Sequence, residues 1–420
     1  MVYVISIEGK ALMPCKAAKA RKLLRDKKAR IYKRDPFTIQ LKFPCENQVQ
    51  EVSLGIDAGS KHIGLSATTQ DRELYAADVE LRTDIVDLLS TRRELRRTRR
   101  NRKTRHRQPR FDNRVHSKHK GWLAPSVENK IQSHLNMVKA VNEILPISET
   151  HVETASFDIQ KIKNPEIAGK EYQQGEQVDS WNVREYVLWR DNHTCQCCKG
   201  KSKDPVLNTH HIESRKTGGN TPGNLVTLCK TCHQKYHRGE IKLPDRIKRQ
   251  PSYRDATFMG IMRWTFYERL KELYNNVSMT FGYITKNTRI RNGLPKEHYV
   301  DARCISGNPT AESLGYYYYL RKVRCHNRQI HKQKILKGGG RKRNQAEYLV
   351  KGFRLFDKVR YQGKEYFISG RRKTGYFDIR DLKGNKVNKG SIGCKKLQLV
   401  ETRKGYITER RMQGCGTVVG

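Results

Sequence analysis

Two cysteine pairs with zinc-binding spacing constrain the fold of this chain more than any other feature of its sequence. Cys195 and Cys198 form one C-x-x-C pair, and Cys229 and Cys232 form the other. A tetrahedral zinc ion bound by four thiolates needs two such short turns brought together, so the spacing predicts a structural Zn²⁺ site. Cys197 lies inside the first pair, and the sequence leaves open whether it replaces Cys198 as a ligand. The chain has eleven cysteines, an odd number, which favours metal-binding thiolates in a reducing compartment over a disulfide framework.

A group of residues able to bind metal or transfer protons lies between and just after the cysteine pairs. They are His210, His211, Asn224, His233 and His237. The i, i+4 spacing puts the last two on one face of a helix, and the order HHIESRKTGG, NLVTLC and CHQKYH predicts a β-hairpin packed on that helix. Such a unit has too little core of its own, so a zinc ion would stabilise it. With the zinc closed by four thiolates, the histidines remain available for a second function.

The chain carries a large excess of positive charge. Among its 420 residues, Lys and Arg number 85 against 42 Asp and Glu, which gives a formal net charge of +43. Like charges repel in the compact state, so the expected partner is a polyanion. Nucleic acid fits best, because each neutralised phosphate releases condensed counterions. No apolar run of about 18 residues exists to span a membrane, and the opening MVYVISIEGKALMP lacks the pattern of a secretion signal.

Residues 91–110 concentrate this charge. The segment TRRELRRTRRNRKTRHRQPR holds ten Arg and one Lys, and proline is absent until Pro109. Arg and Leu favour helix, so a helix with guanidinium groups on every side is predicted. Because guanidinium makes bidentate contacts to phosphate, this helix is expected to contact nucleic acid. The residues expected to make these contacts are Arg92, Arg93, Arg96, Arg97, Arg99, Arg100, Arg102 and Arg105.

Hydrophobic patterns predict the remaining elements. The segments VSLGIDAGS (52–60), HIGLSATT (62–69) and LYAADVEL (74–81) predict a three-stranded meander. Upstream, a small β/α module is expected, with a strand at 2–7, a helix at 16–31 and a strand at 37–43. Downstream, the patterns predict helices at 129–145, 258–274 and 294–306, a strand ending at Glu153, a strand at 277–285, a basic linker at 321–345 and a small β-barrel from about residue 350.

Four residues far apart in the sequence are candidates for a second site. Asp57, Glu153 and Asp301 each lie at a strand end or on a helix flanking the expected sheet, and His298 shares a helix face with Asp301. Paired divalent ions need bridging carboxylates, because one anion must serve both cations. Hard Mg²⁺ prefers oxygen ligands. The sequence therefore predicts an acidic two-metal site, provided that the fold brings these segments together.

These motifs, taken in their order, resemble those of a known family. The histidine pattern resembles the HNH nuclease motif in its zinc-stapled, ββα-metal form, and GIDAGS, HVE and HYVDA resemble the three separated segments of a RuvC-like nuclease. An HNH unit between the second and third segments, with an Arg-rich helix after the first, is similar to the IscB family, the compact, transposon-encoded relatives of CRISPR effector nucleases. KALMP at 10–14 resembles the PLMP segment of that family, with Ala11 in place of its first proline.

The resemblance implies an α/β fold class. It consists of an RNase H-like (RuvC) mixed sheet split in three segments, with an inserted ββα-metal HNH domain, an Arg-rich bridge helix and a C-terminal small β-barrel. The implied domains are an N-terminal PLMP-like domain (1–50), RuvC-I (51–82), the bridge helix (83–115), RuvC-II (116–180), the HNH domain with structural zinc (181–245), RuvC-III (246–318), a basic linker (319–349) and a barrel that interacts with the target-adjacent motif (350–420).

The resemblance also implies an activity and its residues. The protein is expected to be an RNA-guided endonuclease of double-stranded DNA, a monomer in a ribonucleoprotein with an omega RNA guide, in a prokaryotic cytoplasm and without membrane contact. The HNH unit would cut the guide-paired strand and the RuvC-like site the displaced one. His211 would be the general base, with Asn224 orienting it; His210 and His237, with His233 as a further candidate, would hold one Mg²⁺. Asp57, Glu153 and Asp301, with His298, would hold two Mg²⁺. Family members often have Asp where His210 stands.

Two other functions are compatible with the sequence. One is a guide-free HNH endonuclease of the homing or restriction type, which would share the charge and the histidine cluster. The other is a catalytically inert RNA-binding scaffold stapled by zinc. Retention of Asp57, Glu153, Asp301, His210 and His211 argues against an inert scaffold. Two nuclease sites in one chain favour guided cutting over the guide-free alternative.

Overall fold

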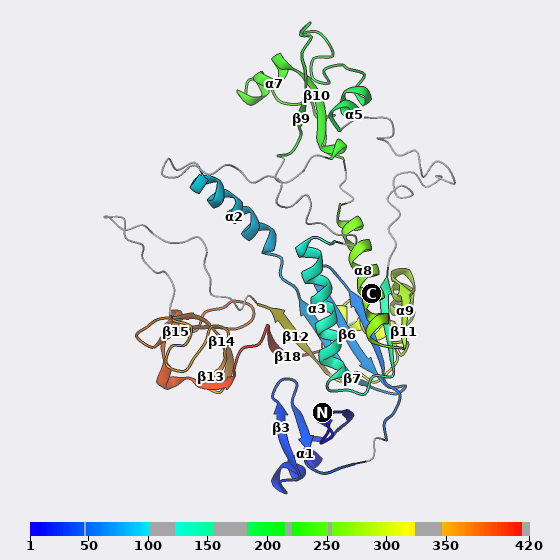
Figure 1. Ribbon diagram of the computed structural model, residues 1–420, viewed down its shortest axis with the longest axis vertical. Coiled ribbons are helices and arrows are strands. Elements are labelled where there is room, and N and C mark those ends of the chain that lie inside the picture. Colours follow the sequence, from blue (N-terminus) through cyan, green and yellow to red (C-terminus); the bar gives the residue numbers. More distant parts are fainter. Residues whose placement is uncertain are drawn as a thin grey trace. The chain divides into compact units, whose positions relative to one another are not determined.

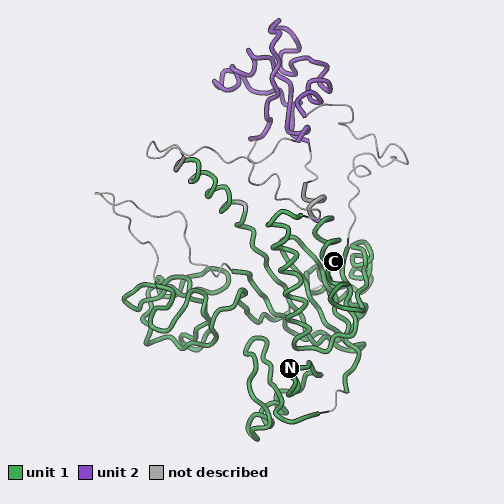
Figure 2. Tube along the Cα trace, viewed as in Figure 1, with its two compact units in different colours: residues 1–155, 261–420 green, residues 156–260 purple. Residues whose placement is uncertain are grey.

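The computed structural model describes residues 1–45, 48–100, 122–154, 183–214, 221–250, 254–323 and 347–413. The chain divides into two compact units: residues 1–155 together with 261–420, and the inserted residues 156–260 (Figure 2). The first unit contains the acidic candidates and the second contains the cysteines and histidines. Within the described ranges, no helix is both long enough and apolar enough to cross a bilayer.

A seven-stranded mixed sheet forms the core of the first unit (Figure 1). Its strand order is β11-β8-β5-β6-β7-β12-β18. The strands are β5 (Ser53–Ala58), β6 (His62–Thr68), β7 (Glu73–Glu80), β8 (Glu149–Thr154), β11 (Val277–Phe281), β12 (Tyr316–Lys322) and β18 (Tyr406–Met412). The antiparallel β5, β6 and β7 are the predicted meander. Strands β8 and β11 extend it in parallel, so segments distant in sequence meet at the same sheet edge.

Helix α10 (His298–Ile305) packs directly on this sheet because two glycines leave room for it. A Cβ on Gly55 would lie 1.9 Å from the Ala302 carbonyl oxygen, and one on Gly64 would lie 2.0 Å from the His298 carbonyl oxygen. Any other residue at these positions would push the helix away from β5 and β6. The opposite face of β5 carries Leu54 and Ile56, which are fully buried. The strands are therefore covered on both faces, as their near-continuous apolar sequence indicates.

The remaining helices of the first unit are α1 (Ala17–Arg25), α2 (Ile85–Arg100), α3 (Pro125–Asn142), α8 (Arg254–Leu273, which begins at the end of the second unit) and α9 (Gly282–Arg291). Helix α3 starts with Pro125 in its first turn, where the missing N–H costs no hydrogen bond. Its His134 lies against Phe266 of α8, with ring centroids 5.0 Å apart. Its Lys130 donates a hydrogen bond to the carbonyl oxygen of Ser60 beside β6. These contacts join α3 to α8 and to the turn that follows β5.

The N-terminal module contains twice as many strands as the sequence predicts. Its sheet has the order β2-β1-β4-β3, formed by β1 (Val2–Ile5), β2 (Ala11–Cys15), β3 (Ala29–Lys33) and β4 (Thr38–Leu41). The prediction of one helix over 16–31 is wrong in its second half. The helix is capped at Asp26, Lys27 adopts a left-handed φ of 56°, and the chain then turns into β3. The Tyr3 hydroxyl donates to the Leu74 carbonyl oxygen and so links this module to β7.

The C-terminal module is a five-stranded antiparallel sheet of order β16-β15-β14-β13-β17. Its strands are β13 (Lys358–Tyr361), β14 (Lys364–Arg371), β15 (Tyr376–Arg380), β16 (Ile392–Gly393) and β17 (Gln398–Glu401). Val359, Ile368 and Phe377 are fully buried in its core. The prediction of short strands with glycine turns after residue 350 is confirmed, but the last strand, β18, leaves this sheet and pairs antiparallel with β12.

Two further boundaries differ from the sequence prediction. The expected strand 277–285 ends at Phe281, and Gly282 begins α9. Strand β12 continues to Lys322, past the expected start of the linker at 319, with Tyr316 and Tyr318 buried. Most of the predicted linker lies outside the described residues. Both errors arise because partners distant in sequence, β8 for β11 and β7 for β12, determine these strands.

The inserted unit is a small ββα structure with an additional helix. It contains α5 (Val183–Arg190), the antiparallel hairpin of β9 (Leu207–His211) and β10 (Leu225–Cys229), the 3-10 turn η3 (Pro222–Asn224) and α7 (Lys230–His237). The predicted β-hairpin followed by a helix is confirmed. Its apolar core is a few residues, of which Val226 and Leu228 are buried beside three of the cysteines. A unit this small needs a covalent or metal staple.

Candidate functional site

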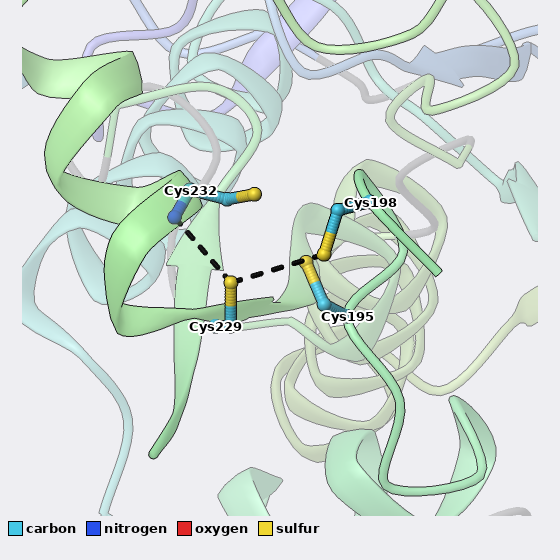
Figure 3. A group of neighbouring side chains, drawn as sticks. All are labelled: Cys195, Cys198, Cys229 and Cys232. Atoms are coloured by element: carbon cyan, nitrogen blue, oxygen red, sulfur yellow. Dashed lines mark hydrogen bonds between the residues drawn. The ribbon is translucent and has the colours of Figure 1, made fainter. Parts of the chain in front are cut away.

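The four predicted cysteine ligands lie together in the inserted unit (Figure 3). Cys195 and Cys198 lie in the turns after α5, Cys229 is the last residue of β10, and Cys232 lies in the first turn of α7. Their sulfur atoms are all within 4.8 Å of one another. Cys229 is also the N-cap of α7, because its sulfur accepts a hydrogen bond from the Cys232 amide. Cys197 is not a member of this group, so Cys198 is the fourth ligand candidate.

This cluster fits a tetrahedral zinc ion. Sulfur atoms bound at about 2.3 Å to such an ion lie about 3.8 Å apart, and the sulfur atoms of Cys198 and Cys229 are 4.0 Å apart. Burial, together with the neighbouring Cys229, raises the pKa of Cys232. Burial also raises the pKa of Cys195. A bound cation is therefore needed to keep these sulfurs as thiolates at neutral pH.

Three histidines form a second cluster in the same unit. His210 projects from β9, and His233 and His237 project from one face of α7. Their nearest ring nitrogens all lie within 4.8 Å of one another, and the two Nε2 atoms on α7 are 3.3 Å apart. His210 is 5% exposed, and its Nε2 has no hydrogen-bond partner among the described residues. A buried imidazole nitrogen without a partner, facing two more imidazoles, fits a metal ligand.

The electrostatics of this cluster keep the imidazoles of His210 and His233 neutral. Burial, with His233 and His237 close by, lowers the pKa of His210 to about 4. Burial and His237 also lower the pKa of His233. Neutral imidazole is the form that binds a metal ion, so both residues are ready to coordinate at neutral pH.

His211 and Asn224 lie beside this cluster. His211 is the last residue of β9 and pairs with Leu225, and its charge contributes to the lowered pKa of His210. Asn224 is fully buried; its side-chain oxygen accepts from the Glu213 amide, and its side-chain nitrogen donates to the Glu213 carbonyl. These hydrogen bonds to Glu213 hold the backbone two residues beyond His211. The predicted role of Asn224 in orienting His211 stays a prediction.

The three predicted acids meet at one end of the central sheet. Ile56 pairs with Val152 in parallel register, so Asp57 and Glu153 follow side by side on β5 and β8. The close approach of α10 at Gly64 places His298, and one turn later Asp301, over β5. Burial, followed by the Asp57 charge, raises the pKa of Glu153. Burial, followed by Asp57, also raises the pKa of Asp301. These shared effects indicate one acidic site.

Each of these carboxylates faces a cationic or protonatable side chain. His298 Nδ1 is 2.7 Å from an Asp57 oxygen, Arg263 Nη1 is 3.2 Å from a Glu153 oxygen, and Arg289 Nε is 2.9 Å from Asp301 Oδ1. The last contact is an ion pair without an aligned hydrogen bond, since both atoms are buried and lack a hydrogen-bond partner. A buried carboxylate oxygen with unused acceptor capacity fits Mg²⁺, which prefers oxygen ligands.

Sequence reasoning missed the residues that support the acidic site. Arg263 is 8% exposed and also donates from Nε to the Ala58 carbonyl, which fixes its position between β5 and β8. His62 stacks on His298 with ring centroids 4.9 Å apart and bonds Asp78 through Nδ1. Hydrogen bonding to Asp57 raises the pKa of His298 despite its burial. No local motif marks Arg263 or His62; Arg263 lies on α8 and His62 on β6, and only the packing of these distant elements brings them to the site.

The structure describes part of the predicted nucleic-acid-binding helix. α2 ends at Arg100. Within it, Arg93, Arg96 and Arg97 are exposed and Arg92 is half-buried. The side chains of Arg99 and Arg100 are not described, and Arg102 and Arg105 lie outside the described residues. The exposed guanidinium groups suit a contact with phosphate, which stays a prediction.

Two family models match this chain. The RRXRR protein model matches residues 2–175, and the HNH endonuclease model matches residues 195–239, the segment that holds the four-cysteine and three-histidine clusters. The chain thus carries an HNH endonuclease domain within residues 195–239, and its N-terminal part matches RRXRR proteins.

Individual proteins resemble parts of the chain. It is 38% identical over 55 residues to anaredoxin from Nostoc sp. strain PCC 7120, which covers 13% of this chain and 68% of that protein. A solved structure of Streptococcus thermophilus Cas9 in complex with the GGAA PAM aligns at 13% identity and a TM-score of 0.36, covering 52% of this chain and 31% of that one. The type II-C Cas9 enzyme from Actinomyces naeslundii aligns at 12% identity and a TM-score of 0.25, covering 62% and 60%. This chain therefore spans less than two thirds of either Cas9 chain.

Proposed function

We propose that this nuclease is an RNA-guided endonuclease of double-stranded DNA. The observation that supports this most is that one strongly basic chain carries two groups of potential metal ligands, one in each compact unit. The three-histidine cluster lies on a zinc-stapled ββα unit, and the acidic site lies on the central sheet. Two strands of a duplex need two cuts, and a guide RNA that pairs with one strand leaves the other single-stranded. We therefore assign one of the two sites to each DNA strand.

At the inserted unit, His211 acts as the general base. It removes a proton from the attacking water through an imidazole ring nitrogen. Asn224 keeps the backbone after His211 in place through its two hydrogen bonds to Glu213. His210, His233 and His237 hold the divalent ion. When bound, such an ion stabilises the charge that develops on the scissile phosphate. This unit cuts the guide-paired strand.

At the acidic site, which cuts the displaced strand, Asp57, Glu153 and Asp301 would hold Mg²⁺. When bound there, Mg²⁺ would supply activation of the water and charge stabilisation at the leaving oxygen. Arg263 and Arg289 hold the second and third carboxylates in place and reduce the cost of burying them. His298 bonds Asp57 and fixes its orientation. Arginines on α2 contact the guide RNA, and the C-terminal sheet reads a short target-adjacent motif.

Sequencing the RNA bound to the purified protein tests the guide. A discrete structured RNA, and cutting only of DNA that matches its guide segment, is the expected result. Active protein free of RNA would favour the guide-free HNH endonuclease. If the protein cuts no DNA with any guide, in Mg²⁺ or in a transition metal, the result would favour the catalytically inert RNA-binding scaffold.

Strand-labelled DNA then assigns the two sites. His211→Ala should cut only the displaced strand, and Asp57→Ala should cut only the guide-paired strand. Continued double-strand breaks by either variant would contradict the assignment of that residue. The two variants serve as controls for each other, because each keeps one site intact in a folded protein.

A further inference from the structure

The three-histidine cluster and the acidic site offer different kinds of ligand atoms. In the inserted unit, His210, His233 and His237 supply three imidazole nitrogens, and the described residues add no carboxylate to this group. On the central sheet, Asp57, Glu153 and Asp301 supply carboxylate oxygens at one strand end. The two sites therefore differ in the ions they can hold tightly.

Magnesium does not fit the histidine cluster. Mg²⁺ is hard, demands near-octahedral geometry at about 2.0–2.1 Å, and is bound through carboxylates, phosphates and water. Imidazole suits Zn²⁺, Ni²⁺, Cu²⁺ and related transition ions. A single carboxylate would give a site some preference for hard ions, and among the described residues this group has none. His210 is 5% exposed with an unpartnered Nε2, so its nitrogen is aimed inward and not into solvent.

The geometry of the cluster also favours a small tetrahedral or five-coordinate ion. Nitrogen ligands at about 2.0–2.1 Å from a tetrahedral Zn²⁺ lie about 3.3–3.4 Å apart. The Nε2 atoms of His233 and His237 are 3.3 Å apart, which matches that separation without rearrangement. Three protein ligands leave an open coordination position, as in catalytic zinc sites.

We propose that the histidine cluster takes a transition-metal ion of the Zn²⁺, Co²⁺ or Ni²⁺ type in place of Mg²⁺, so that the two nuclease sites require different metals. This rests on the proposed function only for its consequence, which is that the metal supplied decides which strand is cut. With Mg²⁺ alone, the protein nicks the displaced strand; with a transition ion added, it cuts both. The binding preference itself depends on the ligands alone.

Metal binding to the intact protein, without nucleic acid, tests the preference. Mild chelation should leave one Zn²⁺ per chain, held by the four cysteines, as measured by elemental analysis. Titration with Co²⁺ in a large excess of Mg²⁺ should then show one further site, with a nitrogen-ligated spectrum that lacks thiolate charge transfer. His237→Ala should lose this Co²⁺ and keep its Zn²⁺, which confirms that the unit is still folded. His193→Asn, which changes an exposed histidine of the same unit, should bind Co²⁺ like the parent protein.

Three outcomes would overturn the proposal. The first is displacement of the Co²⁺ by millimolar Mg²⁺. The second is a Co²⁺ site that persists in His237→Ala, which would mean that the ion binds elsewhere. The third is a second variant, His210→Asp, that binds Mg²⁺ no better relative to Co²⁺ than the parent does. If Co²⁺ binding follows the expectation while no guided cutting is found, the metal preference holds and the proposed function fails. If guided cutting of both strands proceeds with Mg²⁺ alone, the preference fails and the function holds.

Discussion

At the scale of single residues, buried charges at the acidic site depend on partners that come from other elements. Glu153 on β8 faces Arg263 on α8, and Asp301 on α10 faces Arg289 on α9. A buried carboxylate without such a partner would protonate in place of staying charged. These arginines are therefore positioning residues: they keep the acids ionised and oriented for metal binding.

Removing Arg263 should make cutting of the displaced strand more sensitive to acid. Burial and Asp57 raise the pKa of Glu153, whereas Arg263 lowers it, so Arg263→Gln raises that pKa further. A larger fraction of Glu153 is then protonated at a given pH near the pKa, and a protonated carboxyl is a poor metal ligand. The acid limb of the rate–pH profile for the displaced strand should move to higher pH.

Arg269→Gln is the matched control. Arg269 lies on the same helix and bonds Glu128 through both of its terminal nitrogens, away from the acids of the site. The acid limb of the rate–pH profile of Arg269→Gln should coincide with that of the parent protein. An unchanged limb in Arg263→Gln would show that Arg263 does not act through the charge of Glu153.

Most of the candidate metal ligands could be predicted from the sequence, but almost none of the side chains that hold those ligands in position could. The four cysteines and His210, His233 and His237 follow a spacing that a metal requires, so they can be read locally. Asp57, Glu153 and Asp301 were candidates because each lies at a strand end or on a helix flanking the expected sheet, and the order of segments in a known family supported that choice. Arg263, Arg289 and His62 have no such signature, because their positions follow from how distant elements pack.

At the scale of elements, two glycines decide how close α10 comes to the sheet. Gly55 and Gly64 have backbone carbonyls of α10 where their side chains would be. The contact positions both His298 and Asp301, so the acidic site depends on a packing distance as much as on its acids.

Gly64→Ala should disable the acidic site while sparing the inserted unit. Its Cβ would meet the His298 carbonyl oxygen at 2.0 Å, and backbone cannot give way as a flexible side chain can, so α10 must shift. A displacement of about 1 Å at a catalytic group can cost about 100-fold in rate. Cutting of the displaced strand should fall by that order, with guide-paired cutting and zinc content unchanged. Gly393→Ala, where the nearest atom is 3.9 Å away, should cut both strands normally. Normal displaced-strand cutting by Gly64→Ala would mean that α10 tolerates the shift.

The zinc staple of the inserted unit can be tested with two neighbouring cysteines. Cys229→Ala removes a ligand and the N-cap of α7, so zinc should be lost and hydrogen exchange should accelerate across 183–250. Exchange in β5, β6 and β7 should stay slow, because the sheet forms a separate compact unit. Cys197 lies in the turn that carries Cys195 and Cys198 but outside the cluster, so Cys197→Ser should keep its zinc. Zinc retained in Cys229→Ala would contradict the four-thiolate site.

Elements were predictable where their pattern was local. The meander of β5, β6 and β7 follows from apolar runs between short turns. Strands β12 and β18 were missed because one is a tyrosine run entering a basic segment and the other, YITERRM, is charged. Their pairing joins segments about 90 residues apart, and neither segment's sequence indicates which strand it pairs with.

At the scale of the whole molecule, the net charge of +43 sets the behaviour toward nucleic acid. Charge this high gives affinity for any polyanion, so selectivity must come from where the charge is concentrated. Helix α2 presents Arg93, Arg96 and Arg97 to solvent, and α1 with its N-cap residue presents Lys16, Lys19 and Lys22. Only the first is expected to contact the guide.

The salt dependence of RNA binding distinguishes the two helices. Each phosphate contact contributes about 0.7 to the slope of log affinity against log salt for single strands. Changing Arg93, Arg96 and Arg97 together to Gln should therefore reduce the slope by about 2. The same change at Lys16, Lys19 and Lys22 removes equal charge and should alter the slope less. Equal changes in the salt slope from both triple variants would indicate that RNA binds by nonspecific attraction and that α2 is not a dedicated RNA-binding helix.

The place where the chain leaves the central sheet has its own consequence. β8 and β11 are hydrogen-bonded neighbours, yet the whole inserted unit lies between them in sequence. The hydrogen bonds between β8 and β11 can form whether the inserted segment is long, short or of a different sequence. Natural variation can therefore rebuild the histidine-bearing module, ion preference included, without disturbing the scaffold that carries the acids, and the two centres are free to diverge at separate rates.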